Sequence, residues 1–150
     1  MPEKILWKVE YGFKNVHFCE AVVITCLDFR FRWQTAAFIR QYLNFEPFDL
    51  SGLPGASNRI NSKSKAAVSC FSVPCDLHGV KKIIIVHHQD CGAYGGSEGF
   101  NDAKQEQEFH EEELRKSREK ILKMYPDQEV ILIYARLDEK EENIEFVLVE

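Results

Sequence analysis

The sequence lacks any long apolar run, and its start lacks the pattern of an export signal. No stretch approaches the roughly 20 consecutive apolar residues that a membrane-spanning helix requires. The first residues, MPEK, do not form a basic segment followed by an apolar one, which is the pattern of a secretory signal. We therefore expect a cytoplasmic protein with no membrane partner.

An excess of basic residues is also absent. The chain has 19 Lys and Arg against 24 Asp and Glu, which gives a net charge of −5, and the basic residues are scattered. Nucleic-acid binding relies on clustered Lys and Arg that neutralise phosphates, so we expect no nucleic-acid partner. Internal repeats, low-complexity tracts and Pro/Gly/Ser-rich linkers are missing as well. A chain of 150 residues without such a linker is expected to form a single domain over residues 1–150.

Cysteine is scarce and odd in number. The five cysteines are Cys19, Cys26, Cys70, Cys75 and Cys91. Thiols of cytosolic proteins stay mostly reduced, so a framework of disulfides is not expected. Metal binding or simple burial explains these cysteines better.

Short β-branched runs alternate with stretches of helical periodicity, the pattern of an α/β domain. A continuous apolar run such as KIIIVH is typical of a parallel strand that is covered on both faces. We predict a mainly parallel sheet in the order 2-1-3-4 with a C-terminal antiparallel strand, flanked by helices. The predicted strands are residues 21–25, 48–50, 82–87, 129–136 and 144–149; the predicted helices are residues 33–44, 63–78 (kinked or split by Pro74) and 102–125.

Three metal-ligating side chains follow two strands that this topology makes neighbours. Cys26 comes directly after the first strand, and His88 and Cys91 follow the KIIIVH strand. In open sheets, ligands bind at the carboxyl ends of strands where the strand order reverses. Two thiolates and one imidazole suit Zn²⁺, and three protein ligands leave a fourth tetrahedral position open, as catalytic zinc sites do.

Each part of this pattern has a structural explanation when it stands alone. Cysteine is among the most buried residue types, so Cys26 and Cys91 could simply fill the core. Asp28 and Arg30, which follow Cys26, could form an ordinary surface ion pair that contributes about 0–1 kcal/mol. The convergence of both groups on adjacent strand ends favours a metal site.

The segments Cys-x-Asp-x-Arg at 26–30 and His-x-x-Cys-Gly at 88–92 resemble the motifs of β-carbonic anhydrases. The resemblance extends from about residue 20 to the C-terminus, and includes the Pro-Gly-Ala turn at 54–56 and the closing hairpin at 134–150. It implies that Cys26, His88 and Cys91 bind Zn²⁺ and that Asp28 and Arg30 form a catalytic dyad. It also implies a homodimer or a higher homo-oligomer.

The activity that the resemblance implies is the reversible hydration of CO₂ to bicarbonate, the reaction of a carbonate dehydratase. A zinc-bound hydroxide would be the nucleophile, and the Asp28–Arg30 dyad would orient it. If that pair broke, Asp28 could take the fourth metal position itself. Phe29 and Phe31 are candidates to line an apolar pocket. His87 could either shuttle protons or pack locally.

The sequence departs from the family pattern in the pocket wall, and two alternatives follow. Phe29 replaces a small polar residue, His87 occupies the usual glycine position, and Leu53-Pro54 stands in a loop that generally carries an arginine. One alternative is a hydrolase of a related small molecule such as COS or CS₂. The other is a non-catalytic zinc-containing binding or regulatory module, in which Asp28 or Cys19 closes the fourth position.

Overall fold

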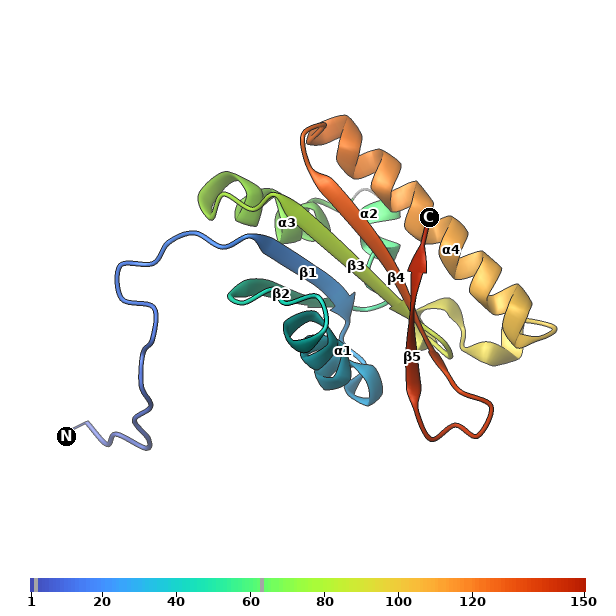
Figure 1. Ribbon diagram of the computed structural model, residues 1–150, viewed down its shortest axis with the longest axis horizontal. Coiled ribbons are helices and arrows are strands. Elements are labelled where there is room, and N and C mark those ends of the chain that lie inside the picture. The colour runs from blue at the N-terminus through green and yellow to red at the C-terminus, as the bar shows by residue number, and fades with distance from the viewer. Residues whose placement is uncertain (2, 63) are drawn as a thin grey trace.

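A five-stranded sheet forms the centre of the computed structural model, which describes residues 1, 3–62 and 64–150 (Figure 1). The strand order is β2-β1-β3-β4-β5. The first four strands are parallel, and β5 runs antiparallel to β4. This confirms the predicted fold class, with its order 2-1-3-4 and its antiparallel last strand. The strands are β1 (Ala21–Cys26), β2 (Phe48–Leu53), β3 (Lys82–His88), β4 (Glu129–Leu137) and β5 (Ile144–Val149).

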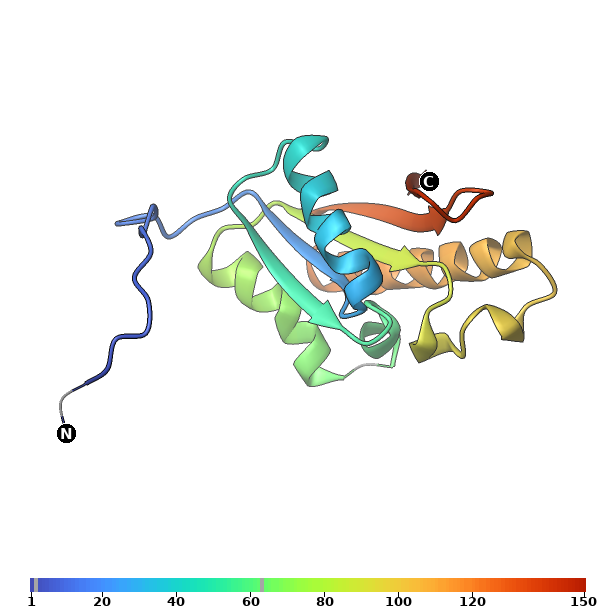
Figure 2. The ribbon, with the colours of Figure 1, turned by 90° about the horizontal axis from the view of Figure 1, so that it is seen from below.

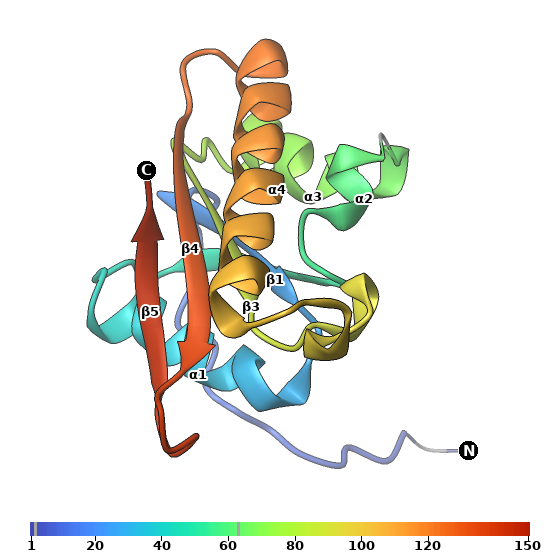
Figure 3. The same ribbon diagram turned by 90° about the vertical axis from the view of Figure 1, so that its right-hand side faces the viewer.

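Helices cover both faces of the sheet. Figures 2 and 3 show α1 on one face and α2, α3 and α4 together on the other. Two short 3₁₀ turns, η1 (Gly92–Tyr94) and η2 (Ser97–Gly99), connect β3 to α4. The helices are α1 (Phe29–Gln41), α2 (Asn58–Asn61), α3 (Lys65–Leu77) and α4 (Ala103–Met124).

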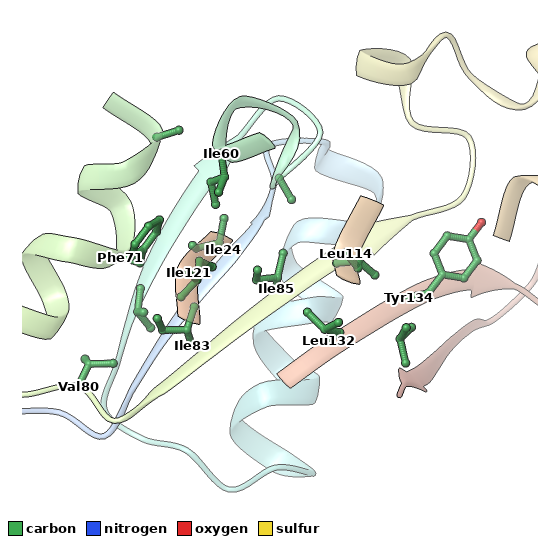
Figure 4. Packing of buried hydrophobic residues seen from close by; sticks show 14 residues of the cluster. Ile24, Ile60, Phe71, Val80, Ile83, Ile85, Leu114, Ile121, Leu132 and Tyr134 are labelled. Atoms are coloured by element: carbon green, nitrogen blue, oxygen red, sulfur yellow. The ribbon is translucent and has the colours of Figure 1, made fainter. Parts of the chain in front are cut away.

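Both faces of the central strands are buried, which is why these strands read as continuous apolar runs. Alternate residues of β1 and β3 point to opposite faces, as the period of a strand requires. Ile24 and Ile85 pack with Phe71 of α3 and Leu114 of α4 (Figure 4). On the other face the cluster includes Val23, Ile84 and Val86 of the strands and Phe31 and Ile39 of α1.

Three predicted boundaries need correction. Helix α1 begins at Phe29 rather than at residue 33, because the Asp28 side chain caps it by accepting the backbone N–H of Arg30 at 2.9 Å. Strand β2 continues to Leu53, since its last three residues pair with the end of β1. Pro74 does not split α3, because it lies in the last turn and its carbonyl accepts the N–H of His78. The predicted start of that helix at Lys63 lies outside the described residues.

The segment before β1 leaves the sheet and extends away from the rest of the molecule (Figure 1). We call residues 3–18 the N-terminal arm. Its apolar side chains are exposed in the single chain, and they include Ile5, Leu6, Trp7, Val9, Tyr11, Phe13, Val16 and Phe18. Among the described residues, no helix has the length and apolar character needed to cross a membrane.

Candidate metal centre

The carboxyl ends of β1 and β3 bring together the three predicted metal ligands. Cys26 is the last residue of β1, His88 is the last residue of β3, and Cys91 lies just beyond it. The two strands are adjacent and parallel, so their carboxyl ends meet at one edge of the sheet. The sulfur atoms of Cys26 and Cys91 and a ring nitrogen of His88 all lie within 4.8 Å of one another, and the three residues are buried.

The distance between the two sulfur atoms fits a cation between them. The Sγ atoms of Cys26 and Cys91 are 3.9 Å apart, and both cysteines are free. A disulfide would need a distance of about 2.05 Å. Two zinc–sulfur bonds of about 2.3 Å that meet at the tetrahedral angle place the sulfurs about 3.8 Å apart. The spacing of the thiols therefore fits a tetrahedral metal site.

The orientation of His88 leaves one ring nitrogen available. Its Nδ1–H donates to the carbonyl of Gln89 at 2.7 Å, which fixes the tautomer and leaves the lone pair on Nε2. Nε2 is buried and has no hydrogen-bond partner among the described residues. Phe31 stacks on the ring, with the two centroids 4.3 Å apart. Such an unpartnered, fixed nitrogen fits a metal ligand.

The two thiols shift each other's pKa in opposite directions. The thiol of Cys91 hydrogen-bonds to Cys26 and, with a smaller contribution from His88, lowers the pKa of Cys26 to about 4. The pKa of Cys91 is raised, first by that same bond to Cys26 and then by burial. The two opposite shifts have one cause, the hydrogen bond between the two sulfur atoms. A divalent cation would stabilise both thiolates, because each needs a positive charge beside it.

Asp28 presents an ionised carboxylate to this donor set. Its Oδ2 lies 3.9 Å from Nε2 of His88. Arg30 contacts the carboxylate with two nitrogens, Nη2 to Oδ2 at 2.6 Å and Nε to Oδ1 at 3.0 Å. These hydrogen bonds hold the pKa of Asp28 below its ordinary value. The structure therefore forms the predicted ion pair, with its carboxylate directed at the metal-ligand cluster.

Arg30 has a second acidic partner, which the sequence did not reveal. Its Nη1 donates to Oδ2 of Asp90 at 2.9 Å, and its Nη2 donates to the Asp90 carbonyl at 3.0 Å. The backbone N–H of Asp90 donates to the buried Glu106 of α4 at 2.6 Å. Arg30 is thus fixed between two carboxylates. The only sequence signal was the position of Asp90 between His88 and Cys91.

His87 belongs to a buried cluster on the opposite face of β3. Its Nε2 lies 2.6 Å from the Ser57 hydroxyl, and its Nδ1 lies 3.0 Å from Nδ1 of His110. Burial lowers the pKa of His87 well below its ordinary value, and burial likewise lowers the pKa of His110 to about 4. Local packing therefore describes His87 better than a shuttle that exchanges protons with solvent. Nothing in the sequence indicated that His110 would join this cluster. It is one of the buried residues of α4.

Two other expected site residues lie elsewhere. Cys19 precedes β1, so the whole strand, roughly 20 Å of extended chain, separates it from Cys26 at the other end. It therefore cannot close the fourth position, as one alternative supposed. The side chain of Phe29 is largely exposed and does not line the site within one chain, whereas Phe31 contacts His88 directly.

Comparison with known proteins gives matches over most of the chain. The family described as "Putative carbonic anhydrase" matches residues 16–147. An uncharacterized protein of Rickettsia bellii (strain RML369-C) is 31% identical over 149 residues, which cover 92% of this chain and 91% of that protein. An uncharacterized protein of Rickettsia conorii (strain ATCC VR-613 / Malish 7) is 31% identical over 133 residues, covering 83% and 72% of the two chains. A structure from a study of two tetrameric β-carbonic anhydrases of the filamentous ascomycete Sordaria macrospora covers 87% of this chain and 81% of that one, at 15% identity and a TM-score of 0.43.

Proposed function

The chain belongs to the family described as putative carbonic anhydrases. From that premise we propose that it is a zinc enzyme that reversibly hydrates CO₂ to bicarbonate. One observation carries the proposal: three buried donor atoms lie within 4.8 Å of one another, and an arginine-bound carboxylate faces them. A structural zinc site would need a fourth protein ligand, and Asp28 could become that ligand only by giving up its contacts with Arg30 at both carboxylate oxygens.

Cys26, His88 and Cys91 would hold the metal and leave its fourth tetrahedral position to water or substrate. When bound, zinc supplies the Lewis acidity that lowers the pKa of a coordinated water towards neutrality. The Nδ1–H bond of His88 to the Gln89 carbonyl keeps Nε2 directed at the two sulfurs. The protein therefore presents its three donors already oriented.

Asp28 would orient the attacking oxygen. Its carboxylate stays ionised beside Arg30 and can accept a hydrogen bond from that oxygen, which turns an oxygen lone pair towards the carbon of CO₂. Arg30 contacts Asp28 at both carboxylate oxygens, so it also keeps Asp28 from entering the donor set itself. The contact of Arg30 with Asp90 fixes the arginine in that position.

The test is stopped-flow CO₂ hydration with the full chain after loading with zinc. We expect a rate above the buffer that rises in proportion to protein concentration. Zinc-loaded protein without such a rate contradicts the proposal. If the same sample released hydrogen sulfide from COS or CS₂, the related hydrolase would be the better assignment, whereas zinc binding without turnover of any of the three would indicate a binding module.

We also propose that the chain forms a homodimer or a higher homo-oligomer through the N-terminal arm. Exposed apolar side chains of this number seldom remain in water, and Phe29 and Trp33, one turn apart on α1, are also exposed, at 81% and 68%. A second copy of the chain would cover these surfaces.

The thiolate donors need a reducing compartment, so the cytoplasm is the location that fits this enzyme.

Replacing Ile5, Leu6 and Trp7 together by serine is expected to convert the oligomer into monomers. Burial of each such side chain contributes roughly 1.5–3 kcal/mol, so the dissociation constant should rise by about 10³-fold or more. Light scattering over a dilution series measures the change. Met124→Ser, which alters an exposed apolar side chain at the end of α4, serves as the control and should leave the mass unchanged. An unchanged mass of the triple variant contradicts the proposal.

A further inference from the structure

A second cluster of metal-ligating side chains lies at the opposite end of the sheet. Cys19 precedes β1, Asp49 is the second residue of β2, and His78 directly follows α3. One donor atom from each lies within 4.8 Å of the other two. The first site occupies the carboxyl ends of the parallel strands, whereas this cluster lies at their amino ends. The two sites are therefore separate, and the second does not depend on the proposed activity.

Hydrogen bonds fix the three residues relative to one another. Nδ1 of His78 and Oδ2 of Asp49 are 2.6 Å apart. The backbone N–H of Cys19 donates to the His78 carbonyl at 3.1 Å. The side chains of His78 and Asp49 remain 44% and 31% exposed, so an ion can reach them from solution.

The cluster opens into a cavity of about 190 Å³. Most of the cavity wall is apolar, and the base of the N-terminal arm contributes part of it. His17, which also lines the cavity, offers a further ring nitrogen. The remaining lining residues are Phe13, Val16, Phe18, Pro47 and Phe48. A cation at the cluster would therefore have room for a fourth ligand, supplied by His17 or by water.

We propose that Cys19, Asp49 and His78 form a second site for a thiophilic divalent cation of the zinc class. Thiolate sulfur, imidazole nitrogen and carboxylate oxygen are the three kinds of zinc ligand. A thiolate disfavours Mg²⁺ and Ca²⁺, which take oxygen ligands. On binding, the Cys19 thiol would release its proton to solvent, and His78 would take the tautomer with its hydrogen on Nε2, so that Nδ1 offers a lone pair to the cation in place of the hydrogen bond to Asp49.

A cation here would join three parts of the chain that are distant in sequence. Cys19 lies between the N-terminal arm and β1, Asp49 lies at the start of β2, and His78 directly follows α3. The site would secure the base of the arm to the body of the molecule. Its role is therefore to position the arm.

Equilibrium dialysis of the full chain against buffered free Zn²⁺, followed by metal analysis, tests the site. We expect two zinc equivalents per chain in the unaltered protein and one in each of the variants Cys19→Ser and His78→Ala. Cys70→Ser, which removes a partly exposed cysteine outside both clusters, is the matched control and should keep two. After loading with Co²⁺, Cys19→Ser should also lose part of the thiolate-to-cobalt charge-transfer absorbance.

The proposal is overturned if Cys19→Ser and His78→Ala both bind as much zinc as the unaltered protein, whether that amount is two equivalents, one or none. His78→Ala keeps the test valid if Cys19→Ser fails to fold, because the His78 side chain is partly exposed. Loss of the first site leaves this test unaffected, since Cys26→Ser removes a different equivalent. Failure of one site can thus be told apart from failure of the other.

Discussion

Cys26→Ser is expected to lose one zinc equivalent and, with it, CO₂ hydration. Structural zinc sites with four ligands bind with about 10–16 kcal/mol, so one thiolate contributes roughly 3 kcal/mol, or about 10²-fold or more in affinity. The loss should be larger here, because the remaining ligands number only two. Metal analysis after dialysis against a mild chelator measures the zinc content, and stopped-flow measures the activity.

Cys70→Ser is the matched control for this substitution. It makes the same change of sulfur to oxygen at a position on α3 away from the donor set, and it should keep both zinc and activity. Circular dichroism would verify that Cys26→Ser stays folded, since serine has nearly the size of cysteine. Full zinc content and full activity in Cys26→Ser would show that the catalytic metal lies elsewhere.

Asp28→Asn should separate catalysis from metal binding. We expect the zinc content to stay unchanged while kcat/KM for CO₂ hydration falls by about 10²-fold, because positioning of the attacking oxygen is lost. The neutral amide accepts a hydrogen bond more weakly than the carboxylate does, and it cannot keep the charged pair with Arg30. Asparagine is nevertheless as good a helix N-cap as aspartate, so α1 should remain intact.

The control for Asp28→Asn is Asp127→Asn, the same change at an exposed turn between α4 and β4. It should leave kcat/KM unaltered. The two variants are compared at equal zinc occupancy, so a difference in rate reports on the carboxylate alone. Activity of Asp28→Asn close to that of the unaltered protein would remove Asp28 from the mechanism and leave the dyad as a structural ion pair.

Local sequence patterns predicted the fold because each central strand is buried on both faces. The run KIIIVH admits few other interpretations, and the carboxyl ends of parallel strands must meet at one edge. That is why Cys26, His88 and Cys91 could be brought together before any coordinates were known. Their arrangement follows from topology, and topology follows from the strand–helix alternation.

The contacts that the sequence did not reveal are those between side chains from unrelated elements. Arg30 and Asp90 are 60 positions apart, and no periodicity links a helix start to a loop beyond β3. His78 and Asp49 meet because the end of α3 reaches the start of β2, which depends on helix packing rather than on the pattern of either segment. The effect of Pro74 on α3 could not be predicted for a similar reason. Pro74 does not split the helix because it lies in the last turn, and the position of that helix end was not evident from the sequence.

One carboxylate begins a helix and faces the metal-ligand cluster at the same time. Oδ1 of Asp28 accepts the backbone N–H of Arg30, the second residue of α1, and its Oδ2 lies 3.9 Å from Nε2 of His88. Unwinding of the first turn of α1 would therefore release the Asp28 carboxylate from its position and inactivate the site at the same time. Activity should consequently be lost together with the helix start, so the rate of CO₂ hydration would report whether the first turn of α1 is formed.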